Sequence, residues 1–477
     1  MKVAIIGGGI SGLSAAFYLG KERANGAPVE YTLFDSEPRL GGSMYSEHID
    51  GCVVEAGPDS FLTEKPWAIN LCQELGIGDQ LIGSNDSLRK TYIIVKNRLI
   101  AMPDGLMFMV PTKLIPTALT PLFSIGTKIR MGLELLHPPR AVGHDETVAD
   151  MVRRHFGEEV VDRLADPLLS GVYGGDAASL SVRAVLPRFV EMEEKYGSLS
   201  RAMLDAHNKM LAAKKKAPQG APRPLFTSLK AGMQQMVSAI EDRLDKSAIR
   251  TGTPIESISR CGSEWQIKTA AGYERYDAVV LATPAKIAGR LLKQVAPELA
   301  TDLEGIVYSS SVTVTLGYSM EQLKGLPPGF GFLVPHSEGT RMLACTFVHN
   351  KFPHRAPADR GIIRCFLGGT KDEAVLDLSD DEIRDTCIRE LRKILKLDAL
   401  QSPNFVRVYR WKGAMAQYTP GHIERVKRIE NAVKQIPGLA VIGNAFKGIG
   451  VPDCVRSGQE AATTLANLAR NATSVKQ

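Results

Sequence analysis

Glycines near the start of the chain have the spacing of a nucleotide-binding turn. Gly7, Gly9 and Gly12 fit the pattern G-x-G-x-x-G directly after the apolar run KVAII, which predicts a buried parallel strand. Such glycines permit a tight turn, a close approach of the backbone to a pyrophosphate, and close packing of strand and helix. The N–H groups that open the following helix then face the phosphates. The predicted contacts of this turn are Gly7, Gly8, Gly9, Ile10, Ser11 and Gly12.

An acidic residue ends the second predicted strand, VEYTLFD. Asp35 stands where the carboxylate of a dinucleotide-binding unit accepts the ribose 2′-hydroxyl. Its distance from the glycines exceeds the usual ~20 residues, which the segment KERANGAP explains as a longer helix end and loop. The β-α-β unit therefore predicts a dinucleotide site with Asp35 and its neighbour Ser36 beside the adenosine.

Two further turns follow that an NAD site does not require. Arg39-Leu40-Gly41-Gly42 lies just beyond the acid, and its sequence fits either a plain surface turn or the far side of a pyrophosphate site. In combination with the first turn it resembles the extended FAD fingerprint of amine-oxidase-like flavoproteins. The second of these turns is the segment Gly57-Pro58-Asp59-Ser60, which follows Glu55 and Ala56. The predicted contacts of the two turns are Arg39, Gly41, Gly42, Gly57, Pro58, Asp59 and Ser60.

A second glycine-rich turn lies more than 400 residues later, in GLAVIGNAFKGIGVPDCVRSG. It predicts a strand, a turn and a helix that begins near Asp453, with backbone N–H groups free to meet a flavin ring at the helix N-terminus. We therefore expect both ends of the chain to hold one FAD. The strand 279–284 is either a structural strand or one that returns to the cofactor. The remaining predicted contacts are Ile255, Trp411, Gly443, Ile449, Gly450 and Val451.

These motifs together resemble the oxygen-dependent protoporphyrinogen and coproporphyrinogen oxidase family, of the bacterial type. The resemblance covers nearly the whole chain and includes GPDSFL, PLLSGVYGGDAASLSV, GFGFLVP, FPHRAP and GNAFKGIGVPDC. It implies an FAD enzyme of heme biosynthesis that uses O2 to oxidise a porphyrinogen to the porphyrin and releases H2O2. The sequence does not decide between protoporphyrinogen IX and coproporphyrinogen III as the substrate.

The resemblance also implies an α/β fold with a discontinuous domain structure. A Rossmann-like, glutathione-reductase-like FAD domain would comprise residues 1–86, 220–290 and 411–477. A substrate domain on a mixed α+β sheet would comprise residues 87–111 and 291–410. A helical domain of residues 112–219 would complete the chain, and in this family such a domain often contacts a membrane or another subunit, so a homodimer is an expectation by analogy.

Residues that contact the substrate are implied by the same resemblance. Phe330 and Ile306 would pack against the macrocycle, although both also fit an ordinary core. Gly171 and Gly174, in SGVYGGD, would allow a close approach of the backbone to the ring.

The substrate propionates require a cation. Plant and animal members place an arginine where this chain has Thr91. Arg89 and Lys90 are the predicted substitutes, with Lys65 or Arg98 as alternatives.

No side chain is predicted to be catalytic, because no Ser-His-Asp, Cys-His or paired-carboxylate arrangement is evident and N5 of FAD would accept the hydride. The nine histidines and seven cysteines lack metal-ligand spacing, so no metal is expected. The odd number and wide spacing of the cysteines indicate reduced thiols and a cytoplasmic location. A net charge of +6 is too diffuse to indicate nucleic acid.

The apolar segment 105–126 contains Pro111, Pro116 and Pro121 and makes a poor continuous helix. It is either a buried, substrate-lining segment or a surface that contacts one leaflet of the cytoplasmic membrane. Two other functions stay open. One is an FAD-dependent amine oxidase or desaturase, which commonly carries an aromatic pair near the flavin. The other is a non-catalytic FAD-binding protein, which would need no large apolar pocket.

Overall fold

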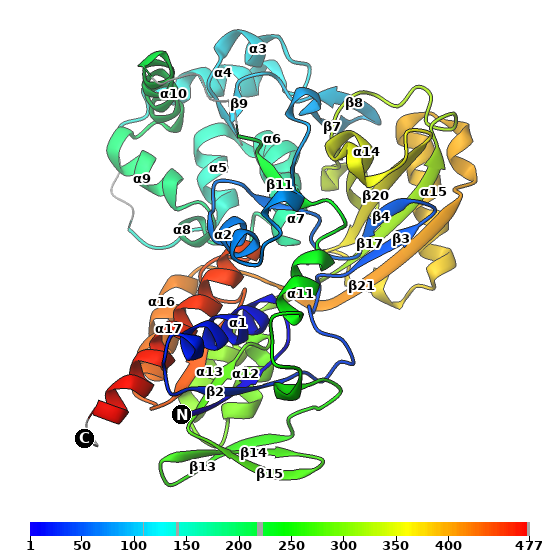
Figure 1. The fold of residues 1–477 in the computed structure, drawn as a ribbon. Helices are drawn as coiled ribbons and strands as arrows, with labels where there is room; N and C mark the ends of the chain where they lie inside the picture. Colours follow the sequence, from blue (N-terminus) through cyan, green and yellow to red (C-terminus); the bar gives the residue numbers. More distant parts are fainter. Residues whose placement is uncertain (108, 140–142, 217–222, 475–477) are drawn as a thin grey trace. The chain divides into compact units, whose positions relative to one another are not determined.

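The computed structural model describes residues 1–107, 109–139, 143–216 and 223–474 (Figure 1). The chain divides into two compact units, and each takes segments that are far apart in the sequence. The first unit comprises Met1–Ser84, Pro224–Val307 and Glu424–Gln477. The second comprises Asn85–Arg223 and Tyr308–Ile423.

A five-stranded parallel sheet forms the centre of the first unit. Its order is β12-β2-β1-β16-β22, so the first strand of the chain pairs with strands from the N-terminal and middle segments, and the last strand joins the edge. Both faces of β1 are buried, which explains its uninterrupted apolar sequence. The strands are β1 (Lys2–Ile6), β2 (Glu30–Phe34), β12 (Ile249–Arg250), β16 (Ala278–Leu281) and β22 (Leu439–Val441).

Helix α1 (Ile10–Ala24) packs along α17 (Val451–Ser474), and Figure 1 shows the two helices side by side. The contact is close because α17 has glycine at position 458. A Cβ atom there would lie 2.5 Å from the backbone oxygen of Ser11. The core of this unit also includes α2 (Trp67–Glu74) and α11 (Gln234–Glu241).

The first unit is completed by shorter elements. The strands are β3 (Ser46–Ile49), β4 (Cys52–Glu55), β5 (Phe61–Leu62), β6 (Leu81–Gly83), β11 (Phe226–Leu229), β13 (Ser257–Cys261), β14 (Glu264–Thr269) and β15 (Gly272–Tyr276). The helices are η1 (Gly78–Gln80), η5 (Lys246–Ala248), α12 (Ala285–Leu292), α13 (Pro297–Glu304) and α16 (His422–Lys434), the last of which starts just before the unit boundary.

A seven-stranded mixed sheet forms the centre of the second unit. Its order is β21-β17-β20-β19-β18-β7-β8, and every pair is antiparallel except β18 with β7. Helix α15 (Asp380–Leu395) packs on this sheet and starts with a capping box between Ser379 and Glu382, which satisfies two N–H groups at its start. The strands are β7 (Thr91–Val95), β8 (Arg98–Ala101), β17 (Tyr308–Ser319), β18 (Gly331–Leu333), β19 (Met342–Phe347), β20 (Arg360–Gly368) and β21 (Phe405–Ala416).

The second unit also contains a series of helices between Leu114 and Lys216. They are α3 (Leu114–Leu119), α4 (Ile125–Leu133), η3 (Glu134–Leu136), α5 (Val148–Phe156), α6 (Glu158–Val160), η4 (Val161–Ala165), α7 (Asp166–Tyr173), α8 (Val182–Val185), α9 (Pro187–Tyr196) and α10 (Leu199–Lys216). The expected boundary between residues 219 and 220 lies outside the described residues. The division into three domains stays a prediction.

Short segments connect these parts of the second unit. They are η2 (Asp86–Leu88), β9 (Leu106–Met107), β10 (Val110–Pro111), η6 (His336–Glu338), α14 (Val348–Lys351), η7 (Pro353–Arg355), η8 (Glu373–Asp377) and η9 (Asp398–Gln401). An α/β architecture of mixed sheets and helices is thus confirmed.

The apolar segment 105–126 combines the two structures expected for it. Val110 and Leu122 are completely buried in the core of the second unit. In contrast, Ile115, Leu119 and Ile125 are each more than 70% exposed. Among the described residues, no helix is both long enough and apolar enough to cross a bilayer.

Candidate cofactor and substrate sites

The first glycine turn is tightly packed at Gly7 and Gly12 and open at Gly9. A Cβ atom on Gly7 would lie 2.7 Å from the backbone oxygen of Ala282, and one on Gly12 would lie 1.9 Å from that of Gly7. Gly9 has no atom within 4 Å of such a Cβ position. The first backbone bond within α1 runs from Leu13 N–H to the oxygen of Gly9, and no side chain caps the helix. The start of α1 therefore presents N–H groups to an open space.

Asp35 lies beside this turn at the end of β2. Its Oδ2 accepts the N–H of Gly8 at 2.6 Å, and its Oδ1 accepts the N–H of Glu37 at 2.8 Å. Thr253 donates its N–H to the backbone oxygen of Asp35 at 2.8 Å, which brings the segment before Ile255 to the same place. Each carboxylate oxygen retains a second lone pair for a ribose hydroxyl.

The turn that contains Arg39 lies against the first one. Gly41 donates its N–H to the oxygen of Gly8 at 2.8 Å, and both Gly41 and Gly42 have positive φ, at 101° and 57°. The Arg39 guanidinium donates to the oxygen of Gly42 at 2.7 Å and lies over the ring of Tyr45. Two glycine-containing loops thus meet above the ends of β1 and β2.

The segment 57–60 packs on the second loop. A Cβ atom on Gly57 would lie 2.0 Å from the backbone oxygen of Ser43, so only glycine fits there. Ser228 donates its hydroxyl hydrogen to the oxygen of Asp59, and Ser60 donates to the Asp59 carboxylate, both at 2.6 Å. These contacts hold the turn with Pro58 in the first unit.

The C-terminal glycine turn meets the same region of the first unit. The backbone oxygen of Gly450 accepts the N–H groups of Asp453 and Cys454, which starts α17. Burial raises the pKa of the Cys454 thiol to about 11, and a hydrogen bond from Ser11 opposes this shift. The first turns of α1 and α17 therefore touch.

An ion pair lies at the start of α17. Lys65 Nζ is 2.6 Å from the buried Asp453 Oδ2, so one cation that the sequence offered for propionate binding is already paired. A carboxylate in the first turn also suits the positive end of the helix dipole.

The residues of the first unit fit FAD. The backbone is open at Gly9 and at Gly443, where a Cβ atom would have no neighbour within 4 Å. Thr283, whose backbone nitrogen borders the Gly7 turn, has a buried Oγ1 without a hydrogen-bond partner among the described residues. Of the predicted FAD contacts, only Trp411 lies in the second unit, on β21. The individual FAD contacts, including Ile449 and Val451, stay predictions.

The second unit brings several predicted substrate residues together around β18. Phe330, which is 8% exposed, donates its N–H to the backbone oxygen of Lys90 at 2.8 Å. The parallel pairing of Gly331 with Thr91 continues this contact. A Cβ atom on Gly171 of α7 would lie 3.5 Å from Leu333 Cδ2, at the far end of the same short strand.

Of the other three predicted substrate residues, Arg89 adjoins Lys90 and Gly174 ends the helix that contains Gly171, whereas Ile306 belongs to the first unit. Arg89 is half exposed, and its Nη1 is 3.8 Å from Asp86 Oδ2. Gly174 ends α7 in a left-handed conformation, where a Cβ atom would meet Met415 at 2.8 Å. Ile306 is 4% exposed in the first unit, while the other predicted substrate residues belong to the second. Its contact with substrate stays a prediction.

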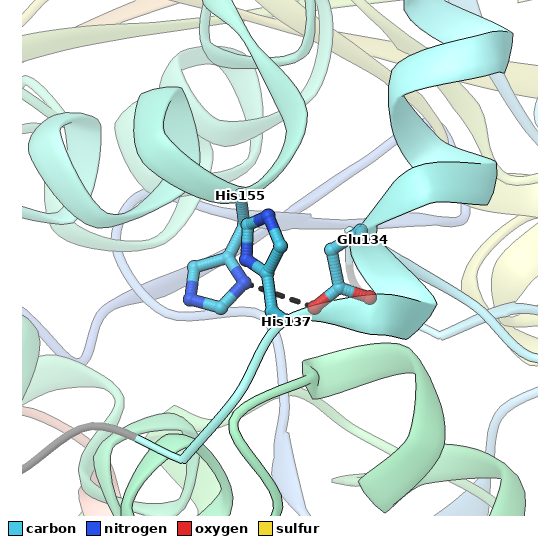
Figure 2. Close-up of side chains that lie close together, drawn as sticks. All are labelled: Glu134, His137 and His155. Carbon is cyan, nitrogen blue, oxygen red and sulfur yellow. Dashed lines mark hydrogen bonds and ion pairs between the residues drawn. The ribbon is translucent and has the colours of Figure 1, made fainter.

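A buried charged cluster in the second unit has no signal in the sequence. Figure 2 shows Glu134, His137 and His155 facing one another from η3, the loop after it and α5. His155 Nδ1 is 2.9 Å from Glu134 Oε1, and both side chains are completely buried. The other imidazole nitrogen, Nε2, is 3.3 Å from Glu193 Oε1, and Arg154 also binds Glu193.

This cluster has the geometry of an ion network rather than of a metal centre. Glu134 accepts hydrogen bonds from the N–H groups of Leu199 and Ser200 and from the Ser198 hydroxyl, so its oxygens are occupied. Although burial opposes the change, hydrogen bonds to Glu134 and Glu193 raise the pKa of His155.

Comparison with known proteins identifies the family. A model of flavin containing amine oxidoreductases matches residues 10–466. The chain belongs to this family. FAD is the cofactor, as the sequence predicts, and this flavoenzyme is an oxidoreductase.

Its relatives match along nearly their whole length. Coproporphyrinogen III oxidase of Bacillus subtilis is 34% identical and covers 96% of each chain. The enzyme of that name in Staphylococcus aureus is 32% identical, over 97% of this chain and 98% of its own. A crystal structure from Exiguobacterium, provisionally named protoporphyrinogen oxidase, has a TM-score of 0.84 at 31% identity, with 98% of both chains covered. The resemblance expected from the sequence is confirmed.

Proposed function

We propose that this flavoenzyme oxidises coproporphyrinogen III to coproporphyrin III with O2 as the electron acceptor and H2O2 as the second product. The observation that carries the proposal is the full-length similarity to enzymes named for that substrate, at 34% and 32% identity. A chloroplast enzyme named protoporphyrinogen oxidase is more distant, at 28% identity. An amine oxidase or a non-catalytic FAD protein has no comparable support.

When bound, FAD accepts a hydride from a saturated bridging carbon of the macrocycle. The residues of the chain supply binding and orientation. The N–H groups at the start of α1 would hold the pyrophosphate, and Asp35 would accept the ribose hydroxyl. The C-terminal glycine turn before α17, which is open at Gly443, would lie beside the flavin ring, because the N–H groups of Asp453 and Cys454 are already bonded to the Gly450 oxygen. Because α1 and α17 touch at Ser11, one rigid pair of helices holds both parts of the cofactor.

The predicted substrate residues other than Ile306 belong to the second unit. Phe330 and the turn that contains Gly171 and Gly174 pack on the flat, apolar macrocycle. Lys90 and Arg89 attract its propionates, of which coproporphyrinogen III has four and protoporphyrinogen IX two. A lysine binds a carboxylate as a point charge rather than through the two-pronged contact of an arginine, so this recognition is electrostatic and less directional.

The test supplies the two porphyrinogens separately to the purified yellow protein in air and follows porphyrin fluorescence. We expect rapid turnover of coproporphyrinogen III and slow turnover of protoporphyrinogen IX. The reverse preference would contradict the assignment of the substrate. Turnover of neither compound by the FAD-loaded protein would contradict the proposed function, and H2O2 production is measured in the same reaction with a peroxidase assay.

We also propose that the exposed apolar face of α3, α4 and η3 contacts anionic lipid. The side chains that form it are Ile115, Leu119, Ile125, Ile129, Leu133 and Leu136, each more than 55% exposed. Lys113, directly before α3, and Arg130, on α4, are exposed and add positive charge. Such an arrangement suits a shallow contact with an anionic membrane surface.

Flotation with phosphatidylglycerol vesicles tests this contact. The wild type should float with the vesicles, and a variant with Ile115→Ser and Leu119→Ser should not. Light scattering of both proteins shows whether the same face instead pairs two copies of the chain, because a dimer that the two substitutions dissociate would favour the predicted homodimer over lipid.

A further inference from the structure

Lys371 lies between two carboxylates beside the glycine turn of α7. Its Nζ is 2.8 Å from Asp166 Oδ2 and 3.2 Å from Asp176 Oδ2. Asp166 starts α7, and Asp176 follows the left-handed Gly174 that ends it. Lys371 comes from the loop after β20, about 200 residues away in the sequence. The cluster therefore joins a sheet loop to both ends of one short helix.

Both carboxylates also bind the backbone that follows the turn. Asp166 Oδ1 accepts the N–H of Ala177 at 3.1 Å, and Asp176 Oδ1 accepts the N–H of Ala178 at 2.8 Å. A Cβ atom on Gly369, just before Lys371, would lie 3.1 Å from the oxygen of Gly174. The loop that carries Lys371 and the end of α7 are thus closely packed.

The charges of the cluster depend on Lys371. Two carboxylates with limited exposure, 12% for Asp166 and 22% for Asp176, share one cation. Burial raises the pKa of Asp166, although Lys371 opposes this shift. Burial also acts to raise the pKa of Asp176, but hydrogen bonds from the N–H of Ala178 and from Asp166, together with the charge of Lys371, lower it. Without the ammonium group, the two acids would repel each other across the turn.

We propose that Lys371 is a positioning residue that holds the Gly171–Gly174 turn in place for the porphyrinogen. The inference rests on the proposed function and extends it to residues outside the predicted contacts. The structural basis is that Lys371 pairs with Asp166 and Asp176, and these carboxylates accept the N–H groups of Ala177 and Ala178, shortly after Gly174.

The experiment measures kcat and KM for coproporphyrinogen III in Lys371→Met, Lys371→Arg and the wild type. A displaced binding turn weakens ground-state and transition-state contacts together, so we expect KM to rise about tenfold in Lys371→Met with kcat within about threefold. Lys371→Arg keeps the charge and should recover most of the loss. Lys324→Met is the matched control, because its ion pair with Glu321 is exposed and belongs to the same unit.

The outcomes separate this inference from the proposed function. An inactive wild type contradicts the proposed function. An active wild type with an unchanged KM in Lys371→Met, or with a lower Tm and kcat at an unchanged KM, overturns the role of Lys371. If Lys371→Met does not fold, Asp176→Asn replaces it, because the amide oxygen can still accept the N–H of Ala178. An unchanged KM in that variant would also overturn the inference.

Discussion

The N–H of Phe330 donates a hydrogen bond to the backbone oxygen of Lys90 at 2.8 Å, so the backbones of these two residues are neighbours. The two residues are 240 positions apart, and the parallel pairing of β18 with β7 brings them together. A porphyrinogen has an apolar ring with carboxylates at its edge, so an aromatic and a cationic residue at neighbouring backbone positions would suit both of its features.

Lys90→Gln should therefore affect the two porphyrinogens differently. Because Lys90 is exposed, its ion pair with a propionate contributes up to about 1 kcal/mol, and KM for coproporphyrinogen III should rise about three- to fivefold. The rise for protoporphyrinogen IX should be smaller. Steady-state kinetics at low salt measure both values, with Lys324→Gln as the control. Equal effects on both substrates would contradict a role in propionate recognition.

Two glycine variants should separate folding from FAD binding. A Cβ atom at Gly12 would overlap the backbone of Gly7, so Gly12→Ala should lose both FAD and stability. Gly9→Ala should fold normally, because its Cβ meets no protein atom, and should bind FAD about tenfold more weakly, which equals about 1.4 kcal/mol. Flavin fluorescence titration and thermal unfolding measure the two effects. Gly132→Ala, at an open position on α4, is the control.

The contact between α1 and α17 should tolerate no larger side chain. In Gly458→Val the new atoms would press on the backbone of Ser11 and Ala15, and overpacking of this kind costs about 1–3 kcal/mol. Thermal unfolding should show a lower Tm and earlier release of FAD, whereas the exposed Thr463→Ala on the same helix should change neither. A normal Tm in Gly458→Val would show that the two helices can separate without consequence.

The buried ion network should make the stability of the second unit depend on pH. The pKa of His155 is raised, so its contribution is complete below the ordinary value of 6.5 and is lost as pH rises through the raised value. Burial raises the pKa of Glu193, but bonds to His155 and Arg154 lower it to about 2. That contribution is complete above 4.5 and is lost as pH falls towards 2.

His155→Gln should remove the alkaline part of this dependence. Breaking a buried pair costs about 3–5 kcal/mol, so the variant should also have a much lower Tm at neutral pH. Thermal unfolding between pH 5 and pH 9 (about the range in which histidine titrates) compares it with the exposed His144→Gln. An unchanged loss of stability at high pH in His155→Gln would assign that loss to another group.

Local sequence determined the cofactor and the architecture of this protein. Each cofactor motif sets the backbone over only a few residues, so its chemistry can be predicted without a structure. These motifs are the glycines at positions 7, 9 and 12, the acid at 35 and the turn that starts at 443. The apolar strands KVAII and VEYTLFD are local in the same way and were predicted, whereas β19 and β21 were not.

Tertiary structure alone decided which distant side chains meet. The sequence around Lys371, Asp166 and Asp176 contains no motif, because their contact depends on the path of β20 past α7. The same holds for Glu134 and His155, which join separate helices through buried charges. The sequence could not assign segment 105–126 to core or surface, because this one apolar run contains both buried residues, such as Val110 and Leu122, and exposed residues, such as Ile115 and Leu119. Backbone geometry follows from neighbours in sequence, whereas ion pairs and burial follow from neighbours in space.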